Sequence, residues 1–150
     1  MERAPEGRDD RSASFLTVAS ENEIYDPLRR KYVARTPEEE VRQAVIQWLC
    51  GAKGFPAGRM ASEYAFRYNR RTYRADILVF DRQLQPHLLV ECKAPGVTLD
   101  AKVVEQVVRY TRVLTVKYVL VTNGTNVHLL RRLPDGSGYE YLSDIPEDLS

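Results

Sequence analysis

The chain has 150 residues, which suffices for one domain with its own hydrophobic core and leaves little room for a second. Its composition, 43% hydrophobic and 29% charged, excludes a wholly disordered chain. With 22 basic and 21 acidic residues, no overall charge draws the protein to nucleic acid, so any such binding must come from a local patch. No apolar run approaches the roughly 20 residues that span a bilayer, and no signal peptide is evident, so we expect a cytoplasmic protein without a membrane partner.

The N-terminal part is rich in charged and small residues. We predict a mobile tail over residues 1–23, followed by a single domain over residues 24–150. Residues 24–35 alternate apolar and basic side chains and are predicted to lie along the domain surface as an extended arm. Two interpretations of the basic side chains stay open, contact with phosphate and simple solvation. These side chains are Arg29, Arg30, Lys31 and Arg35.

A helix is predicted over residues 36–50. Thr36 is expected as the N-cap, Pro37 at the first helical position and Glu39 as the capping-box acid. The apolar side chains fall on one stripe, made of Val41, Ala44, Val45, Trp48 and Leu49. Relative to this stripe, Glu38 faces inward, whereas Glu39 and Glu40 point away and are explained by capping and solvation. For Glu38, a favourable interaction with the helix N-terminus competes with a role in a site.

Residues 59–80 predict two antiparallel strands joined by a turn at 69–71. The hairpin carries four arginines interleaved with tyrosines, which makes it the strongest candidate for contact with DNA phosphates. An exposed edge protected from aggregation is the alternative interpretation of these charges. The arginines are Arg67, Arg70, Arg71 and Arg74.

The segment from Asp76 to Pro95 carries the candidate chemistry. It contains two apolar strands with an acid at the start of the first and the triplet Glu91-Cys92-Lys93 at the end of the second. Side chains alternate across a strand, so Glu91 and Lys93 share one face. If the strands pair as antiparallel neighbours, Asp76 lies next to Glu91. An ordinary ion pair at the strand ends remains the alternative, because D-x(n)-E-x-K is a short pattern.

Two adjacent carboxylates repel each other unless a divalent cation lies between them, and oxygen ligands favour Mg²⁺ or Mn²⁺. Such a cation activates water and neutralises charge on a phosphoryl group, while Lys93 is expected to orient the water or stabilise the transition state. The residues therefore indicate a metal-dependent nuclease.

The remaining elements complete the predicted fold. A helix over residues 98–114 places Gln106 at the flank of its inward stripe, one turn before Tyr110. Strands are predicted at 116–121 and 127–130, with a last edge strand at 139–142. The order αβββαβ predicts an α/β domain of the layered α+β kind, with a mixed central sheet flanked by helices.

Five motifs in this order resemble the PD-(D/E)xK nuclease superfamily, and more closely the N-terminal nuclease domain of type I restriction enzyme R subunits. They are T-P-E-E-E-V-R-Q, R-A-D-I-L-V-F-D, L-L-V-E-C-K-A-P, Q-V-V-R-Y and L-V-T-N-G. The resemblance implies a restriction-endonuclease-like fold and assigns roles to six residues. It makes Asp76 and Glu91 metal ligands, Lys93 the catalytic lysine, Glu38 the helix-one acid near the metal, and Gln106 with Tyr110 a Q-x-x-x-Y element.

The resemblance implies an Mg²⁺-dependent DNA endonuclease, with Mn²⁺ as a substitute. A non-catalytic DNA-binding or assembly module of a restriction or repair complex is the alternative function, and a nuclease acting on RNA differs only in substrate. The chain ends at Ser150 without a phosphate-binding loop, so we expect a free-standing protein or one that works with separately encoded motor, specificity or methylation subunits. A homodimer is a further expectation, because related nucleases cut duplexes as dimers.

Overall fold

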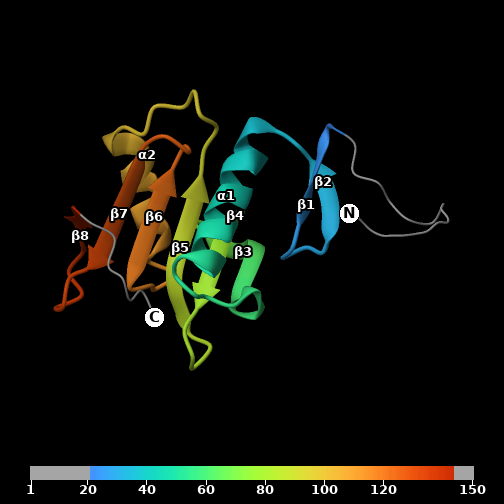
Figure 1. Ribbon diagram of the computed structural model, residues 1–150. Coiled ribbons are helices and arrows are strands. Elements are labelled where there is room, and N and C mark those ends of the chain that lie inside the picture. Colours follow the sequence, from blue (N-terminus) through green and yellow to red (C-terminus); the bar gives the residue numbers. More distant parts are fainter. Residues whose placement is uncertain (1–20, 144–150) are drawn as a thin grey trace.

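The computed structural model describes residues 21–143. The elements in chain order are β1 (Glu23–Asp26), β2 (Lys31–Ala34), α1 (Pro37–Gly51), a 3-10 helix (Ala57–Arg59), β3 (Met60–Tyr68), β4 (Arg71–Phe80), β5 (Pro86–Cys92), α2 (Ala101–Tyr110), β6 (Tyr118–Thr122), β7 (Val127–Arg132) and β8 (Tyr139–Leu142). Strands β3 to β8 form one sheet in sequence order, and β1 and β2 form a separate two-stranded sheet (Figure 1).

The six-stranded sheet is mixed, because β5 and β6 are parallel whereas the other neighbours are antiparallel. The parallel pair is joined by a crossover through α2. Helix α1 covers one face of the sheet, over Ile77 and Val90, and α2 covers the other, over Leu78 and Leu89 (Figure 1). The predicted layered α+β fold is confirmed.

The predicted tail at 1–23 lies outside the described residues except for its last three, and the last of these, Glu23, belongs to β1. The arm predicted at 24–35 is a hairpin rather than a single extended segment. Tyr25 and Tyr32 pair across its two strands with ring centroids 5.2 Å apart. This hairpin lies on the side of α1 away from β6 (Figure 1).

The start of α1 follows the prediction. Thr36 Oγ1 accepts a hydrogen bond from the Glu39 backbone N–H at 3.0 Å, and Pro37 occupies the first turn. The second helix is shorter than predicted, since α2 begins after its own cap at Asp100, whose carboxylate accepts the Val103 N–H at 3.0 Å. It ends at Tyr110, where the backbone continues as a turn.

Two turns of the sheet depend on unusual backbone conformations. Asn69 and Arg70 join β3 to β4 with successive φ values of 52° and 65°, as in the type I′ turns that suit twisted hairpins. Gly124, after β6, has a φ of 90°, and a Cβ there would lie 3.1 Å from Val41 Cγ2 of α1. Glycine is therefore required at 124 both by the backbone and by the close approach of the helix. Within residues 21–143, no helix is long and apolar enough to cross a membrane.

Candidate functional site

The pairing of β4 with β5 brings two of the predicted acids together. Ile77 is opposite Val90 in antiparallel register, so the next residues outward, Asp76 and Glu91, are neighbours. Asp76 Oδ2 also accepts a hydrogen bond from the backbone N–H of Cys92 at 2.7 Å. The Asp76 side chain is 12% exposed and the Glu91 side chain 17%, so the two carboxylates meet away from most of the solvent.

Lys93 lies beside Glu91, as strand alternation predicts. Its Nζ is 3.5 Å from Glu91 Oε2, and its backbone N–H donates to the Thr122 carbonyl of β6 at 2.8 Å. The Lys93 side chain is 34% exposed, so a fixed backbone presents an ammonium group that reaches solvent. Cys92, between the two charges, is buried in the core cluster that contacts α1.

The electrostatics of Glu91 reflect its position. Burial, and next the Asp76 charge, raise the pKa of Glu91 to about 8, and Lys93 acts in the opposite direction. Burial, and next the Asp76 charge, raise the pKa of the Cys92 thiol well above its usual range, which keeps this thiol protonated and unreactive. The raised pKa leaves the Glu91 carboxyl protonated near neutral pH.

The predicted orientation of Glu38 and Glu39 in the first turn of α1 is wrong, whereas Glu40 is exposed as predicted. Glu38 is exposed, whereas Glu39 is buried. The buried side of α1 contains the polar side chains Arg42 and Gln43 as well as apolar ones, and a stripe drawn through apolar residues alone omits them. Glu38 still lies within electrostatic range of β5, because its charge contributes to the raised pKa of Cys92.

Glu39 has a different role from the predicted capping-box acid. Its carboxylate accepts two hydrogen bonds from Arg29 Nη2, at 2.8 and 2.9 Å, and one from Gln43 Nε2 at 2.9 Å. Arg29 is therefore held within the protein, and neither interpretation of it, phosphate contact or solvation, is correct. On the next turn of α1, Arg42 Nη2 lies 3.2 Å from Asp76 Oδ1, a contact that the sequence analysis missed.

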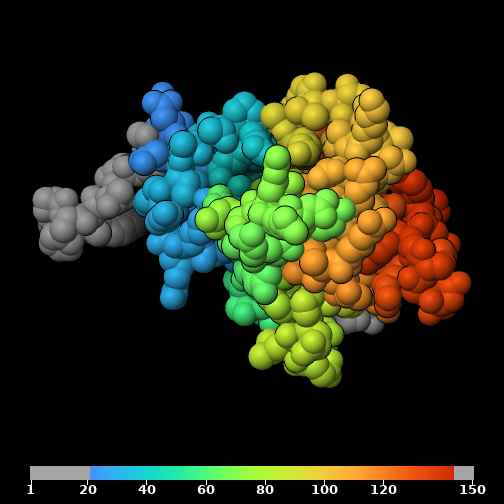
Figure 2. All heavy atoms as spheres, turned by 180° about the vertical axis from the view of Figure 1, so that it is seen from behind, coloured from blue at the N-terminus to red at the C-terminus, as the bar shows by residue number. Residues whose placement is uncertain are grey.

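Gln106 and Tyr110 are brought together on α2, with Gln106 Nε2 donating to the Tyr110 hydroxyl at 3.1 Å. Tyr110 packs against three aromatic rings of the β3–β4 hairpin, at centroid distances between 5.1 and 5.9 Å. These rings are Phe66, Tyr68 and Tyr73. The aromatic cluster thus fixes the hairpin against α2, and Figure 2 shows the green hairpin projecting between the blue N-terminal part and the orange region.

The four arginines predicted to contact DNA are all exposed on this hairpin. Arg67 donates to the Arg70 carbonyl at 2.9 Å, and Arg74 to the Glu63 carbonyl at 3.5 Å. Within residues 21–143, no carboxylate forms an ion pair with Arg67, Arg70, Arg71 or Arg74.

The turn after β6 orders the loop that follows Lys93. Asn123 is buried, accepts the backbone N–H groups of Thr125 and Asn126 at 2.9 and 2.7 Å, and donates through Nδ2 to the Val97 carbonyl at 2.9 Å. The L-V-T-N-G motif therefore has a structural reason. It ties the loop that follows Lys93 to the turn after β6.

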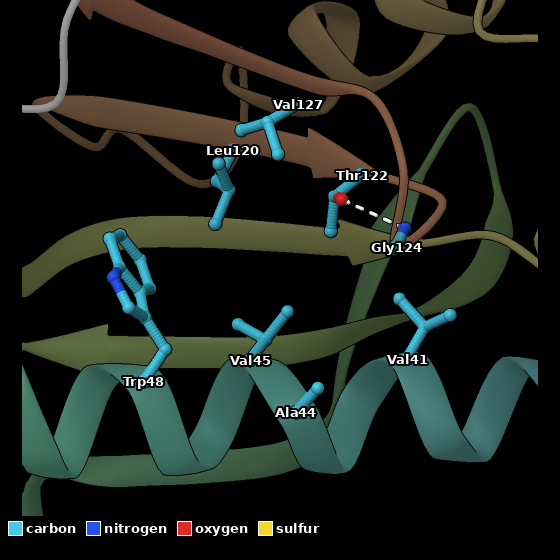
Figure 3. A pocket seen from close by; sticks show the side chains of 8 residues that line it. All are labelled: Val41, Ala44, Val45, Trp48, Leu120, Thr122, Gly124 and Val127. Atoms are coloured by element: carbon cyan, nitrogen blue, oxygen red, sulfur yellow. Dashed lines mark hydrogen bonds between the residues drawn. The ribbon is translucent and has the colours of Figure 1, made fainter.

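An apolar hollow of about 240 Å³ lies between α1 and the strands β6 and β7 (Figure 3). Trp48 and Val45 point into it from the helix and Leu120 from the sheet, while Thr122 Oγ1 accepts the Gly124 N–H at 3.0 Å. The hollow is lined by Val41, Ala44, Val45, Trp48, Leu120, Thr122, Gly124 and Val127. This lining contains no charged side chain, so the hollow is separate from the candidate chemistry.

The charged residues fit a divalent cation only in part. Asp76 and Glu91 supply two adjacent carboxylates of the kind that Mg²⁺ prefers, and water completes such sites. In the described part of the chain, no three His, Cys, Asp or Glu side chains are grouped closely enough to hold a metal. The structure thus brings Asp76, Glu91 and Lys93 together, and it leaves Glu38 apart from the two acids.

Comparison with known families gives one match. A family model described as "Type I restriction enzyme R protein N terminus (HSDR_N)" matches residues 37–146, which is most of the chain. The match includes both helices and all six strands of the main sheet, whereas the β1–β2 hairpin lies before it. No curated protein matches the chain.

Proposed function

Because the chain belongs to the family of type I restriction enzyme R protein N-terminal domains, we propose that it is a metal-dependent DNA endonuclease of a restriction system. The observation that carries the proposal is the approach of Asp76 and Glu91, two largely buried carboxylates with Lys93 beside them. Their mutual repulsion is relieved by a divalent cation. Mg²⁺ is the proposed cofactor and Mn²⁺ a substitute, within the PD-(D/E)xK type of site.

Asp76 and Glu91 would hold the cation, whereas Glu38, exposed on the first turn of α1 and apart from these two acids, stays a prediction as a third ligand. When bound, Mg²⁺ supplies charge neutralisation at a phosphate and activation of water. Asp76 is oriented for this role by the Cys92 N–H on one oxygen and Arg42 on the other. Glu91 must lose its proton before it can act as a ligand, so its raised pKa makes the site sensitive to pH.

Lys93 is proposed as the catalytic lysine. Its backbone is fixed to β6, and its ammonium group lies at the edge of the carboxylate pair with access to solvent. From that position it can donate a hydrogen bond to the attacking water or to a phosphate oxygen. Either contact strengthens as negative charge develops on the phosphoryl group in the transition state.

The DNA is proposed to reach the site along the β3–β4 hairpin. The exposed arginines there offer charge to phosphates, and the contact of Tyr110 with the hairpin rings places Gln106 on the adjoining helix. Separately encoded motor, specificity or methylation subunits and a homodimer stay predictions, as does a cytoplasmic location.

One observation favours a second candidate, a non-catalytic DNA-binding or assembly module. Arg42 already places a cation 3.2 Å from Asp76, so an internal charge partly compensates this acid without a metal. The exposed arginines would suffice for binding to DNA.

Plasmid nicking in the presence of Mg²⁺ or Mn²⁺ separates the two candidates. Asp76→Asn, which preserves the side-chain volume, and Lys93→Ala are each expected to lower the nicking rate by about 10³-fold, as the loss of a transition-state contact does. Lys102→Ala on α2, at an exposed lysine, is the matched control and should cut normally. Nicking that survives both site variants contradicts the proposal. Salt-dependent DNA binding that is unchanged by Asp76→Asn, with no cleavage by the wild type, favours the module.

A further inference from the structure

A chain of charged side chains connects the N-terminal hairpin to the candidate metal centre. Four carboxylates and two guanidinium groups take part, and each carboxylate contacts at least one of the guanidinium groups. From the hairpin to the site they are Asp26, Arg29, Glu39, Glu63, Arg42 and Asp76. Asp26, the last residue of β1, and Arg29, in the turn that follows, lie before the part of the chain that the family model matches.

Arg29 is the first link. Its guanidinium contacts Asp26, both oxygens of Glu39, and Glu63 Oε2 at 3.1 Å. Burial by itself raises the pKa of Asp26, but the Arg29 side chain and the Leu28 N–H outweigh it and lower the net pKa. Asp26 is therefore a charged anchor that holds Arg29 in place.

Arg42 is the second link, and its side chain is only 8% exposed. It lies 3.7 Å from Glu39, 3.4 Å from Glu63 and 3.2 Å from Asp76, and it donates to Ser62 Oγ at 3.0 Å. Because Glu39 and Glu63 are shared by the two guanidinium groups, a change at Arg29 alters the attraction that these acids exert on Arg42.

Asp76 is the last link, and both of its oxygens are engaged. Arg42 contacts Oδ1, and the Cys92 N–H binds Oδ2. We propose that the N-terminal hairpin is a positioning element of the metal centre, in which Arg29 holds Glu39 and Glu63, these hold Arg42, and Arg42 orients the Asp76 carboxylate toward the cation. This inference rests on the proposed function, because it assumes that Asp76 is a metal ligand.

A second ion pair between the same hairpin and α1 supplies the matched control. Arg35 lies 3.2 Å from Glu40, with side chains 38% and 54% exposed, and within residues 21–143 no ion pair joins either side chain to the network that leads to Asp76. Substitution of lysine for arginine keeps the charge but loses the planar fork that binds several carboxylates together. Arg29→Lys therefore tests geometry alone, and Arg35→Lys repeats the same chemical change where no link to Asp76 exists.

The experiment measures Mn²⁺ binding by calorimetry without DNA, and kcat and KM for plasmid nicking. Arg29→Lys is expected to weaken Mn²⁺ binding about tenfold and lower kcat by a similar factor, as loss of partners behind a metal ligand does. KM for DNA should stay unchanged, because neither arginine is placed at the DNA surface. Arg35→Lys should match the wild type, and Arg29→Lys combined with Arg42→Lys should be no weaker than Arg42→Lys alone.

Equal Mn²⁺ affinity and kcat in the Arg29→Lys and Arg35→Lys variants would overturn the inference while the proposed function stands. A wild type that neither binds Mn²⁺ nor nicks DNA instead defeats the proposed function. If Arg29→Lys fails to fold, Glu63→Gln decides, since this side chain is 41% exposed and bridges Arg29 to Arg42. Weaker Mn²⁺ binding by Glu63→Gln supports the inference, and unchanged binding overturns it.

Discussion

Two groups of charged side chains meet at Asp76, and they differ in how completely their charges are paired. In the network from Asp26 to Arg42, Glu39 contacts two guanidinium groups and an amide. At the candidate site, Glu91 has one cation, Lys93 at 3.5 Å, and a like charge beside it. Removing one partner from a buried group of paired charges destabilises the fold, whereas adjacent like charges oppose folding by their repulsion. The difference separates a paired cluster from the site at which we propose that a cation binds.

The largest effect is expected when an acid is removed from the paired group of charges. Glu39→Ala leaves Arg29 and Arg42 without their shared acid and is expected to lower the free energy of unfolding by about 3 kcal/mol. Chemical denaturation of the metal-free protein measures the loss. Glu40→Ala, one residue further along α1 and exposed, is the control and should change stability by less than about 0.5 kcal/mol. Similar losses for both variants would mean that the buried pairing contributes nothing special.

The second test concerns the like-charged pair, Asp76 and Glu91. Here the substitution is expected to raise the stability of the protein rather than to lower it. The folded-state pKa of Glu91, about 8, lies above its ordinary value of 4.5, so its contribution is fully present below pH 4.5 and is lost as pH rises through 8. The metal-free protein should therefore lose stability, roughly 4 kcal/mol, between about pH 5 and 9. Glu91→Gln should remove this dependence and be more stable than the wild type at pH 9, as melting curves would report.

The pH dependence of Mn²⁺ binding is a second test of the raised pKa of Glu91. Because the cation displaces the proton from Glu91, its affinity for the wild type should rise with pH up to about 8, whereas Glu91→Gln should bind weakly at every pH. A wild-type affinity that is flat between pH 6 and 9 would show that Glu91 is already ionised.

The smallest expected effect belongs to a third group, the exposed hairpin arginines, for which residues 21–143 supply no acidic partner. Arg71→Gln is expected to weaken DNA binding about threefold and to reduce the salt dependence of the binding constant by about one phosphate contact. Stability should not change. Arg82→Gln, an exposed arginine beyond the opposite end of β4, is the control, and an equal loss there would remove the hairpin from the DNA path.

The sequence predicts the sheet and the central charges because both follow from local regularities. Strand alternation places Glu91 beside Lys93, and the pairing of two adjacent apolar strands places Asp76 beside Glu91. The orientation of Glu39 could not be predicted in this way, because Glu39 is buried against Arg29 of the N-terminal hairpin. No periodicity in the sequence shows where this hairpin packs against α1. Basic residues on both sides of an acidic helix start, here Arg29 and Arg42 around Glu39, are the sequence signal that could have indicated this network of ion pairs.

The turn at the tip of the basic hairpin has a consequence for the design of variants. Arg70 adopts a φ of 65° at a position where glycine is preferred, and a non-glycine residue in this conformation costs about 1 kcal/mol. Arg70→Gly should therefore give a more heat-resistant protein that holds DNA less well. A search that selects variants for thermal stability alone would choose this change and would damage the surface that we assign to the substrate.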